Sequence, residues 1–68
     1  MSFDWHGGGL SRDLPLDRDF RMTQNVRRFI AAETGHPVRV PREFHDWLKA
    51  ARPATLGHVI DEWVRRYV

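Results

Sequence analysis

The fold is decided by residues 55–67, which read TLGHVIDEWVRRY. Apolar side chains recur there three and four positions apart, a spacing that gives an α-helix one continuous apolar face: Leu56, Val59, Ile60, Trp63, Val64 and Tyr67. Thr55 is a suitable N-cap residue, because its hydroxyl oxygen can accept a hydrogen bond from a free backbone N–H of the first turn. The pattern therefore predicts a helix at about residues 55–67.

Two earlier segments carry the same helical spacing, and they predict two more helices, at about residues 23–34 and 41–51. Thr23 is a candidate N-cap for the first of these helices, and Gly35 is a favourable residue just past its end. Pro41 suits the first position of the second helix. The apolar positions that define the two faces are Val26, Phe29 and Ile30, and then Phe44, Trp47 and Leu48.

The first twenty residues look irregular, and we expect them to form an extended arm on the helices. A single domain of 68 residues with four Phe, three Trp and one Tyr has little surplus core, so Phe3 and Trp5 should pack against it. The alternating pattern also permits a short two-stranded β ribbon of residues 3–5 with residues 38–40. The predicted fold is thus mainly α: one small three-helix domain over residues 1–68.

Composition excludes several classes of protein. The chain has no cysteine, so it has no disulfide and no thiolate ligand or nucleophile. No run approaches the roughly 20 apolar residues of a membrane span, and residues 1–6 lack the basic and apolar regions of a signal peptide. We expect a cytoplasmic protein that does not bind membranes.

The motifs that suggest chemistry lack the context that chemistry needs. His6-Gly7-Gly8-Gly9 matches the oxyanion loop of some lipases, but there is no G-x-S-x-G elbow and no room for a hydrolase sheet. The four histidines are not three or four positions apart, as metal ligands on a helix would be. We therefore expect neither an enzyme, nor a metal site, nor a cofactor.

Charge is distributed unevenly along the chain. The formal net charge is only +2, yet residues 21–52 carry seven basic and three acidic residues, which gives this segment +4. Residues 1–20 carry −2, with two basic and four acidic residues, and residues 53–68 are neutral. Any anion-binding surface should therefore lie in the middle segment.

Arg27 and Arg28 are the leading candidates for such a surface, because Val26, Phe29 and Ile30 face the core and leave both arginines outside it. The remaining candidates are basic residues that the fold would have to bring together with them: Arg21, Arg39, Arg42, Lys49 and Arg52. This set predicts contacts with nucleic-acid phosphates, which charge reversal of Arg27 and Arg28 should abolish without unfolding the domain. The alternative is a solvated charged face whose arginine stems cover apolar surface.

A second functional interpretation is a protein-interaction module, for example a homodimer. It is motivated by large apolar residues in excess of what so small a core can bury, Trp5 and Tyr67 among them. Salt distinguishes the two interpretations, because phosphate binding weakens steeply as salt rises and apolar association does not.

The following segments and residues stand in this order along the chain: Phe3–His6, Thr23–Phe29, Phe44–Lys49, Thr55–Gly57, Glu62-Trp63 and Arg65. Together they resemble a small bacterial domain of unknown function that often follows a SAP-like domain in proteins labelled only as cytoplasmic. The likeness covers nearly the whole chain, and its most specific part is Gln24–Phe29. Val38 and Val40 stand where the family would have an aromatic pair. The resemblance implies an association with nucleic acid, through the SAP-like neighbour, but no catalytic or binding residue.

Overall fold

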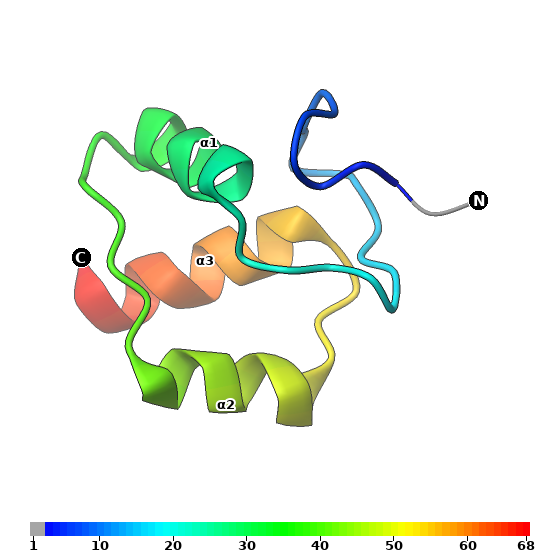
Figure 1. Ribbon diagram of the computed structural model, residues 1–68. Helices are drawn as coiled ribbons and strands as arrows, with labels where there is room; N and C mark the ends of the chain where they lie inside the picture. The colour runs from blue at the N-terminus through cyan, green and yellow to red at the C-terminus, as the bar shows by residue number, and fades with distance from the viewer. Residues whose placement is uncertain (1–2) are drawn as a thin grey trace.

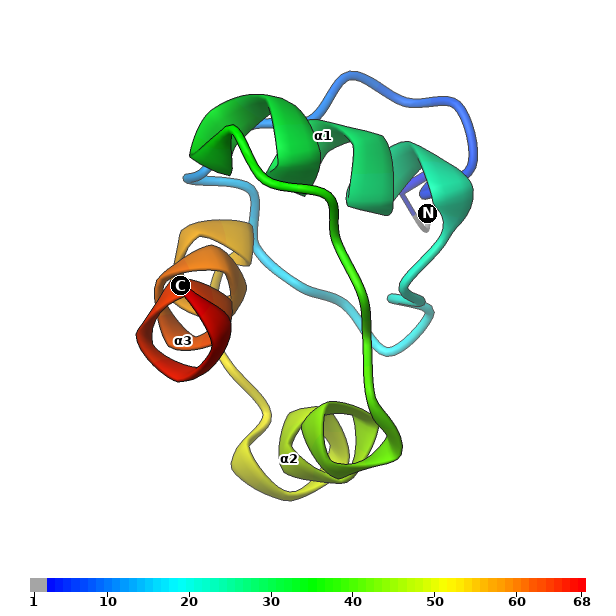
Figure 2. The same cartoon turned by 90° about the vertical axis from the view of Figure 1, so that its left-hand side faces the viewer.

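The structure is a computed structural model that describes residues 3–68, and this range contains three α-helices. α1 spans Gln24–Thr34, α2 spans Arg42–Ala51 and α3 spans Leu56–Tyr67. α2 and α3 run in opposite directions, with α1 above them (Figure 1). Viewed from the side, the three helices occupy the corners of a triangle (Figure 2). The predicted three-helix, mainly α fold is confirmed.

The predicted N-caps lie where α1 and α3 begin. The Thr23 hydroxyl oxygen accepts a hydrogen bond from the backbone N–H of Val26 at 3.2 Å, and Thr55 caps His58 in the same way at 3.3 Å. Gly35 ends α1 in the left-handed conformation at φ +73°, which a residue without a Cβ adopts at little cost. These local signals fix the helix ends before any tertiary contact is considered.

Pro41 differs from its predicted position by one residue. Its backbone is extended, with φ −63° and ψ 160°, so it is the N-cap of α2 and Arg42 is the first helical residue. The fixed φ of proline fits both positions, and the extended ψ decides between them.

The core lies where the three helices meet. Six apolar side chains in it are almost completely buried, and Trp5 and Trp63 are each only 3% exposed. Trp5 comes from the N-terminal arm, and its ring packs edge-on against Phe3 and Phe20, with centroids 4.7 and 4.8 Å away. The predicted packing of the arm on the core is therefore correct. The six buried residues are Val26, Ile30, Phe44, Leu56, Val59 and Ile60.

The β ribbon of residues 3–5 with residues 38–40 does not form. The arm reverses direction instead, with the Gly8 N–H donating to the Asp4 carbonyl at 2.8 Å. Residues 38–40 run as a single extended stretch of chain over α3, where the Trp63 indole N–H donates to the Arg39 carbonyl at 2.9 Å. Alternation of apolar residues indicated a strand here, but both segments find their partners in the helices and loops.

Residues 12–16 lie across the beginning of α3. The Leu56 N–H donates to the Leu14 carbonyl at 2.9 Å, and the Gly57 N–H donates to the Arg12 carbonyl at 2.7 Å. Pro15 and Thr55 form an isolated antiparallel bridge at the same place. The chain itself thus satisfies the first free N–H groups of α3, which a helix end would otherwise offer to water or to an anion.

Candidate nucleic-acid interface

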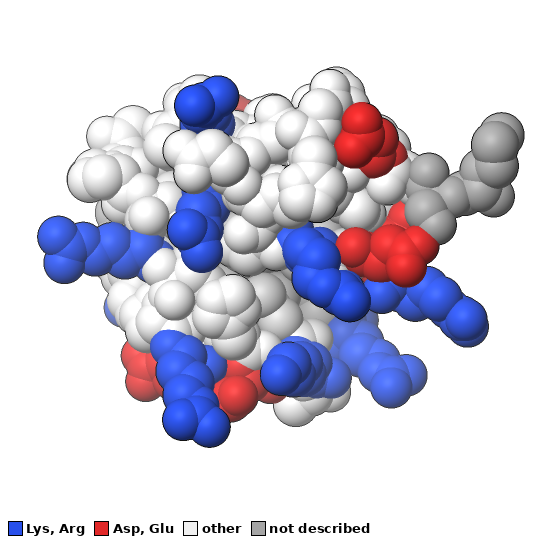
Figure 3. Space-filling model, in the orientation of Figure 1, with Lys and Arg blue, Asp and Glu red and all other residues white. Residues whose placement is uncertain are grey.

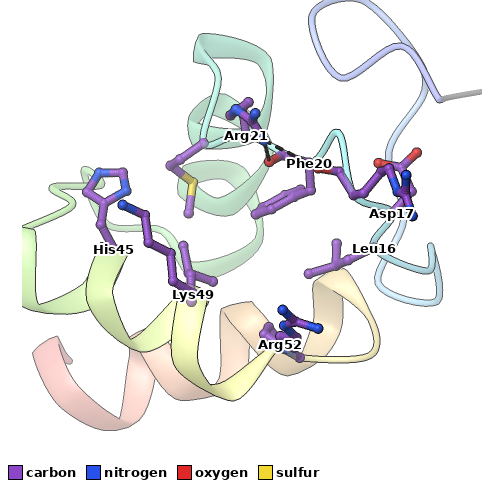
Figure 4. Close-up of a pocket in the computed structure, with 11 residues that line it drawn as sticks. Leu16, Asp17, Phe20, Arg21, His45, Lys49 and Arg52 are labelled. Carbon is purple, nitrogen blue, oxygen red and sulfur yellow. Dashed lines mark hydrogen bonds between the residues drawn. The ribbon is translucent and has the colours of Figure 1, made fainter.

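An open groove of about 960 Å³ separates the segment before α1 from the second half of α2. We call it the basic groove, because four of the side chains that line it are cationic: Arg18, Arg21, Lys49 and Arg52. Its other lining residues are His45, Asp17 and five apolar residues, Leu16, Phe20, Met22, Leu48 and Pro53. In Figure 4, the Phe20 ring lies near the centre of the groove, with His45 and Lys49 on one side and Arg21 above.

One wall of the groove is a row of side chains on α2 and its C-cap. His45 and Lys49 are four residues apart, so they share one face of the helix, and Arg52 lines the same groove just past the helix end. Arg52 is the C-cap of α2 in the left-handed conformation at φ 47°, and its N–H donates to the Leu48 carbonyl at 3.2 Å. Pro53 follows and prevents the helix from continuing.

The opposite wall is the irregular segment before α1, which carries Arg18 and Arg21. The Arg21 guanidinium donates to the Phe20 carbonyl at 2.8 Å and to the Arg18 carbonyl at 3.5 Å. These bonds orient Arg21 and leave its charge without a carboxylate. Both arginines are exposed. The two walls therefore face each other with positive charge on each.

Asp17, the carboxylate among the groove residues, is engaged elsewhere. Its oxygens accept hydrogen bonds from the Trp5 indole N–H at 2.9 Å, the Phe3 N–H at 3.1 Å and the Asp19 N–H at 2.9 Å. The indole bond, followed by the Phe3 bond, lowers the pKa of Asp17 below its ordinary value of 3.8. The carboxylate is thus charged at neutral pH, and it holds the N-terminal arm in place.

Most basic residues have no acidic partner within residues 3–68. Three of the eleven form ion pairs, Arg12 with Asp61 and both Arg65 and Arg66 with Glu62, which leaves eight. Hydrogen bonds from Arg65 and then Arg66 lower the pKa of Glu62 from 4.5 to about 2. Figure 3 shows Lys and Arg side chains across the middle and lower part of the face in Figure 1, with acidic side chains toward its edges.

A sequence model of one protein family matches residues 3–66, and its description is "Domain of unknown function (DUF6434)". The chain belongs to this family. Searches of curated proteins and of solved structures found no match.

In this DUF6434 domain, the run Gln24–Phe29 and the Thr23 before it connect α1 to the N-terminal arm. The Thr23 hydroxyl donates to the Trp5 carbonyl at 2.6 Å, and the Asn25 side-chain amide donates to the Gly8 carbonyl at 3.0 Å. Val26 is completely buried. The most specific phrase of the family resemblance thus serves the fold, and Arg27 and Arg28 are its exposed members.

The DUF6434 structure brings together only part of the predicted binding set. Arg21, Lys49 and Arg52 line the basic groove, whereas Arg27 and Arg28 lie on α1 and do not line it. Arg42 lies in the first turn of α2, and Arg39 borders a smaller hollow of about 330 Å³ with Trp63 and Tyr67. The candidate interface is therefore smaller than the predicted set.

Two groove residues, Arg18 and His45, were not among the candidates. His45 could have been found, because its spacing of four from Lys49 puts the two on one helix face. Arg18 lies in an irregular segment. Because that segment has no helical or strand periodicity, its sequence does not predict which way the Arg18 side chain points. No sequence signal brings that segment next to α2.

Within residues 3–68, no three His, Asp or Glu side chains are close enough together to hold one metal ion. None of the helices in this range combines the length and the apolar character needed to cross a bilayer.

Proposed function

We propose that this DUF6434 domain is a non-enzymatic binding module that contacts nucleic-acid phosphates through the basic groove. The observation that carries the proposal is that four cations converge on one groove from two separate parts of the chain, and none of them has a carboxylate partner within residues 3–68. Guanidinium and ammonium groups are the side chains that recognise phosphate, and unpaired ones can bind it without first breaking an ion pair.

Two further points support binding by this surface. Arg65 and Arg66 are held by Glu62, and Arg12 by Asp61, so the unpaired charge is concentrated in the middle segment. The SAP-like domain with which we associate the family in bacterial cytoplasmic proteins often binds nucleic acid, and this adds support by association. A bacterial, cytoplasmic setting is part of the proposal.

Binding is proposed in preference to catalysis because of the residue types in the groove. The lining residues include no serine, threonine or cysteine that His45 could activate as a nucleophile. Cations around an apolar floor supply the charge and the contact area that ligand binding needs. They do not supply the nucleophile and base that a catalysed reaction needs.

The protein-interaction alternative has less support. Trp5, one of the two residues that motivated it, is only 3% exposed and forms part of the core. Tyr67 is 36% exposed and hydrogen-bonds Glu43. Within residues 3–68, the large apolar side chains that are exposed are those of Tyr67 and Val68, whereas a stable interface takes about 20–30 residues from each partner.

The test compares two double variants that change charge equally. Arg18→Gln with Lys49→Gln removes one cation from each wall of the groove, and Arg27→Gln with Arg28→Gln removes two exposed cations from α1. Each double variant removes two positive charges, so the formal net charge falls from +2 to 0 in both. Binding to a labelled oligonucleotide of about eight nucleotides is measured by fluorescence anisotropy at several salt concentrations.

We expect the groove variant to bind more weakly and to show a shallower salt dependence. On a single strand, the log–log slope should fall by about 0.7 for each phosphate that the variant no longer neutralises. The α1 variant should keep most of the affinity. Equally weakened binding in both variants would show that the groove is not the interface. Failure of the unmodified domain to bind any nucleic acid at low salt would overturn the proposal itself.

A further inference from the structure

We propose that the ligand of the basic groove is single-stranded nucleic acid, with an unstacked base on the apolar floor and its flanking phosphates on the two cationic walls. This inference rests on the proposed function and specifies its ligand. It follows from the shape of the groove and from the chemistry of its floor, neither of which phosphate binding alone requires.

Charge lies on both sides of the groove. His45, Lys49 and Arg52 form one wall, and Arg18 and Arg21 form the other. A chain of phosphates that passes between the walls can contact cations on either side.

The floor of the groove is apolar, and phosphate binding alone does not require an apolar floor. Phe20, Met22 and Leu48 are partly exposed there, and the Phe20 ring projects into the groove in Figure 4. The contact with Trp5 at 4.8 Å is edge-on, at 86°, and it holds the Phe20 ring in position. An aromatic ring in a cationic groove is the arrangement on which a nucleobase stacks.

The groove is concave, which argues against reading a duplex. Proteins read B-DNA by inserting a protruding helix or ribbon into a major groove about 12 Å wide. Here the cations surround a hollow of about 960 Å³, near the upper end of the range of about 300–1,000 Å³ for sites that enclose small molecules. A splayed-out nucleotide suits such a hollow, and a paired base inside a helical stack cannot enter it.

The experiment uses the full chain and four ligands with the same number of phosphates per strand. They are a single-stranded octamer, as DNA and as RNA, a duplex of the same sequence, and a DNA octamer with abasic positions in its centre. We expect the base-containing single strand of DNA or RNA to bind at least about tenfold more tightly than the duplex, and abasic substitution to weaken binding by about tenfold.

A floor variant tests the role of the ring. Phe20→Leu keeps an apolar side chain against Trp5, and we expect it to reduce the discrimination between intact and abasic strands severalfold while the salt slope stays the same. Circular dichroism and the amide NMR spectrum verify the fold. If Phe20→Leu unfolds the domain, Met22→Gln at the same floor provides the second test.

The outcomes separate the two proposals. Equal affinity for single strand, duplex and abasic strand would overturn the single-strand inference and leave phosphate binding intact. Tighter binding of the duplex would overturn it as well. No binding of any of the ligands at low salt would overturn the proposed function and this inference together.

Discussion

Arg52 has a backbone conformation that suits glycine better than arginine. Its φ is 47°, and it is the one residue other than glycine with a positive φ within residues 3–68. The left-handed conformation costs a residue with a Cβ roughly 1–2 kcal/mol. Arg52 has this unfavourable conformation and also lines the groove, so it is a candidate for a role in binding.

Replacing Arg52 by glycine should therefore separate stability from binding. We expect Arg52→Gly to raise the free energy of unfolding by about 0.5–1 kcal/mol, because the backbone strain is relieved. The same variant should bind oligonucleotides more weakly and with a shallower salt slope. Urea unfolding and anisotropy titrations measure the two effects. A decrease in stability would contradict the strain argument, and unchanged affinity would remove Arg52 from the interface.

Partner choice at the level of single residues was only partly predictable. An i, i+4 spacing along α3 would pair Asp61 with Arg65 and Glu62 with Arg66. Only the second forms, because Asp61 pairs with Arg12, which lies 49 residues earlier in the chain. Glu62 then accepts from both Arg65 and Arg66. Spacing predicts neighbours on a helix, but it carries no information about a competing partner from a distant segment.

At the scale of elements, Gly57 joins α3 to the segment that crosses its first turn. A Cβ built at Gly57 would lie 2.9 Å from the Arg12 carbonyl oxygen and 3.3 Å from the Arg12 Cβ. Its own N–H donates to that same carbonyl at 2.7 Å. The two backbones can approach this closely only if position 57 has no side chain.

We expect Gly57→Ala to destabilise the domain by about 1–3 kcal/mol, because residues 12–16 must move away from α3. The control is Gly9→Ala, whose Cβ would meet nothing within 4 Å and should change stability by less than about 0.5 kcal/mol. Thermal and urea unfolding give both values. Equal stability of the two variants would show that the segment at Arg12 can move away from α3 at little cost in free energy.

The helices were the most predictable elements, because their signals are local. The caps Thr23 and Thr55, and Gly35 at the end of α1, specify where the helices begin and end from a few neighbouring residues each. The prediction of the β ribbon was wrong because strand pairing depends on contacts between distant segments. Val38–Val40 has the alternation of a strand, but pairing needs a partner, and the arm is held by Asp17 and Thr23 instead.

At the scale of the whole molecule, acid should unfold the domain through its hydrogen-bonded carboxylates. Glu62 has a pKa lowered from 4.5 to about 2, and the pKa of Asp17 is lowered below 3.8. Since both carboxyl groups bind protons more readily in the unfolded chain, their contribution to stability is complete above about pH 4.5. It decreases progressively as the pH falls toward 2.

The double variant Asp17→Asn with Glu62→Gln should be less stable than the unmodified domain at pH 7 and should depend less on pH between 4.5 and 2. Far-ultraviolet circular dichroism during acid titration and urea unfolding at several pH values measure both effects. Glu33→Gln, which changes an exposed carboxylate on α1, is the control and should leave the pH profile unchanged. An unaltered profile in the double variant would mean that other groups dominate acid unfolding.

The candidate site was less predictable than the fold, because it exists only in the assembled molecule. The charge of +4 over residues 21–52 pointed to the middle of the chain, and Arg21, Lys49 and Arg52 of the basic groove belong to that segment. The opposite wall also needs Arg18, from a segment whose own net charge is negative. The net charge of a sequence segment can locate a charged surface only when the residues of that surface come from the same segment. Here one wall of the groove comes from another segment.

The contacts between residues 12–16 and α3 also constrain the order in which the domain folds. The Leu14 and Arg12 carbonyls accept hydrogen bonds from the N–H groups of Leu56 and Gly57, which lie more than forty residues later in the chain. A ribosome releases α3 after both other helices, so the early segment stays without its partner until synthesis has passed the third helix. Closing contacts over such a separation slows folding relative to a bundle of purely local contacts. These contacts thus join an early and a late part of the described chain, and they can form only after α3 has been made.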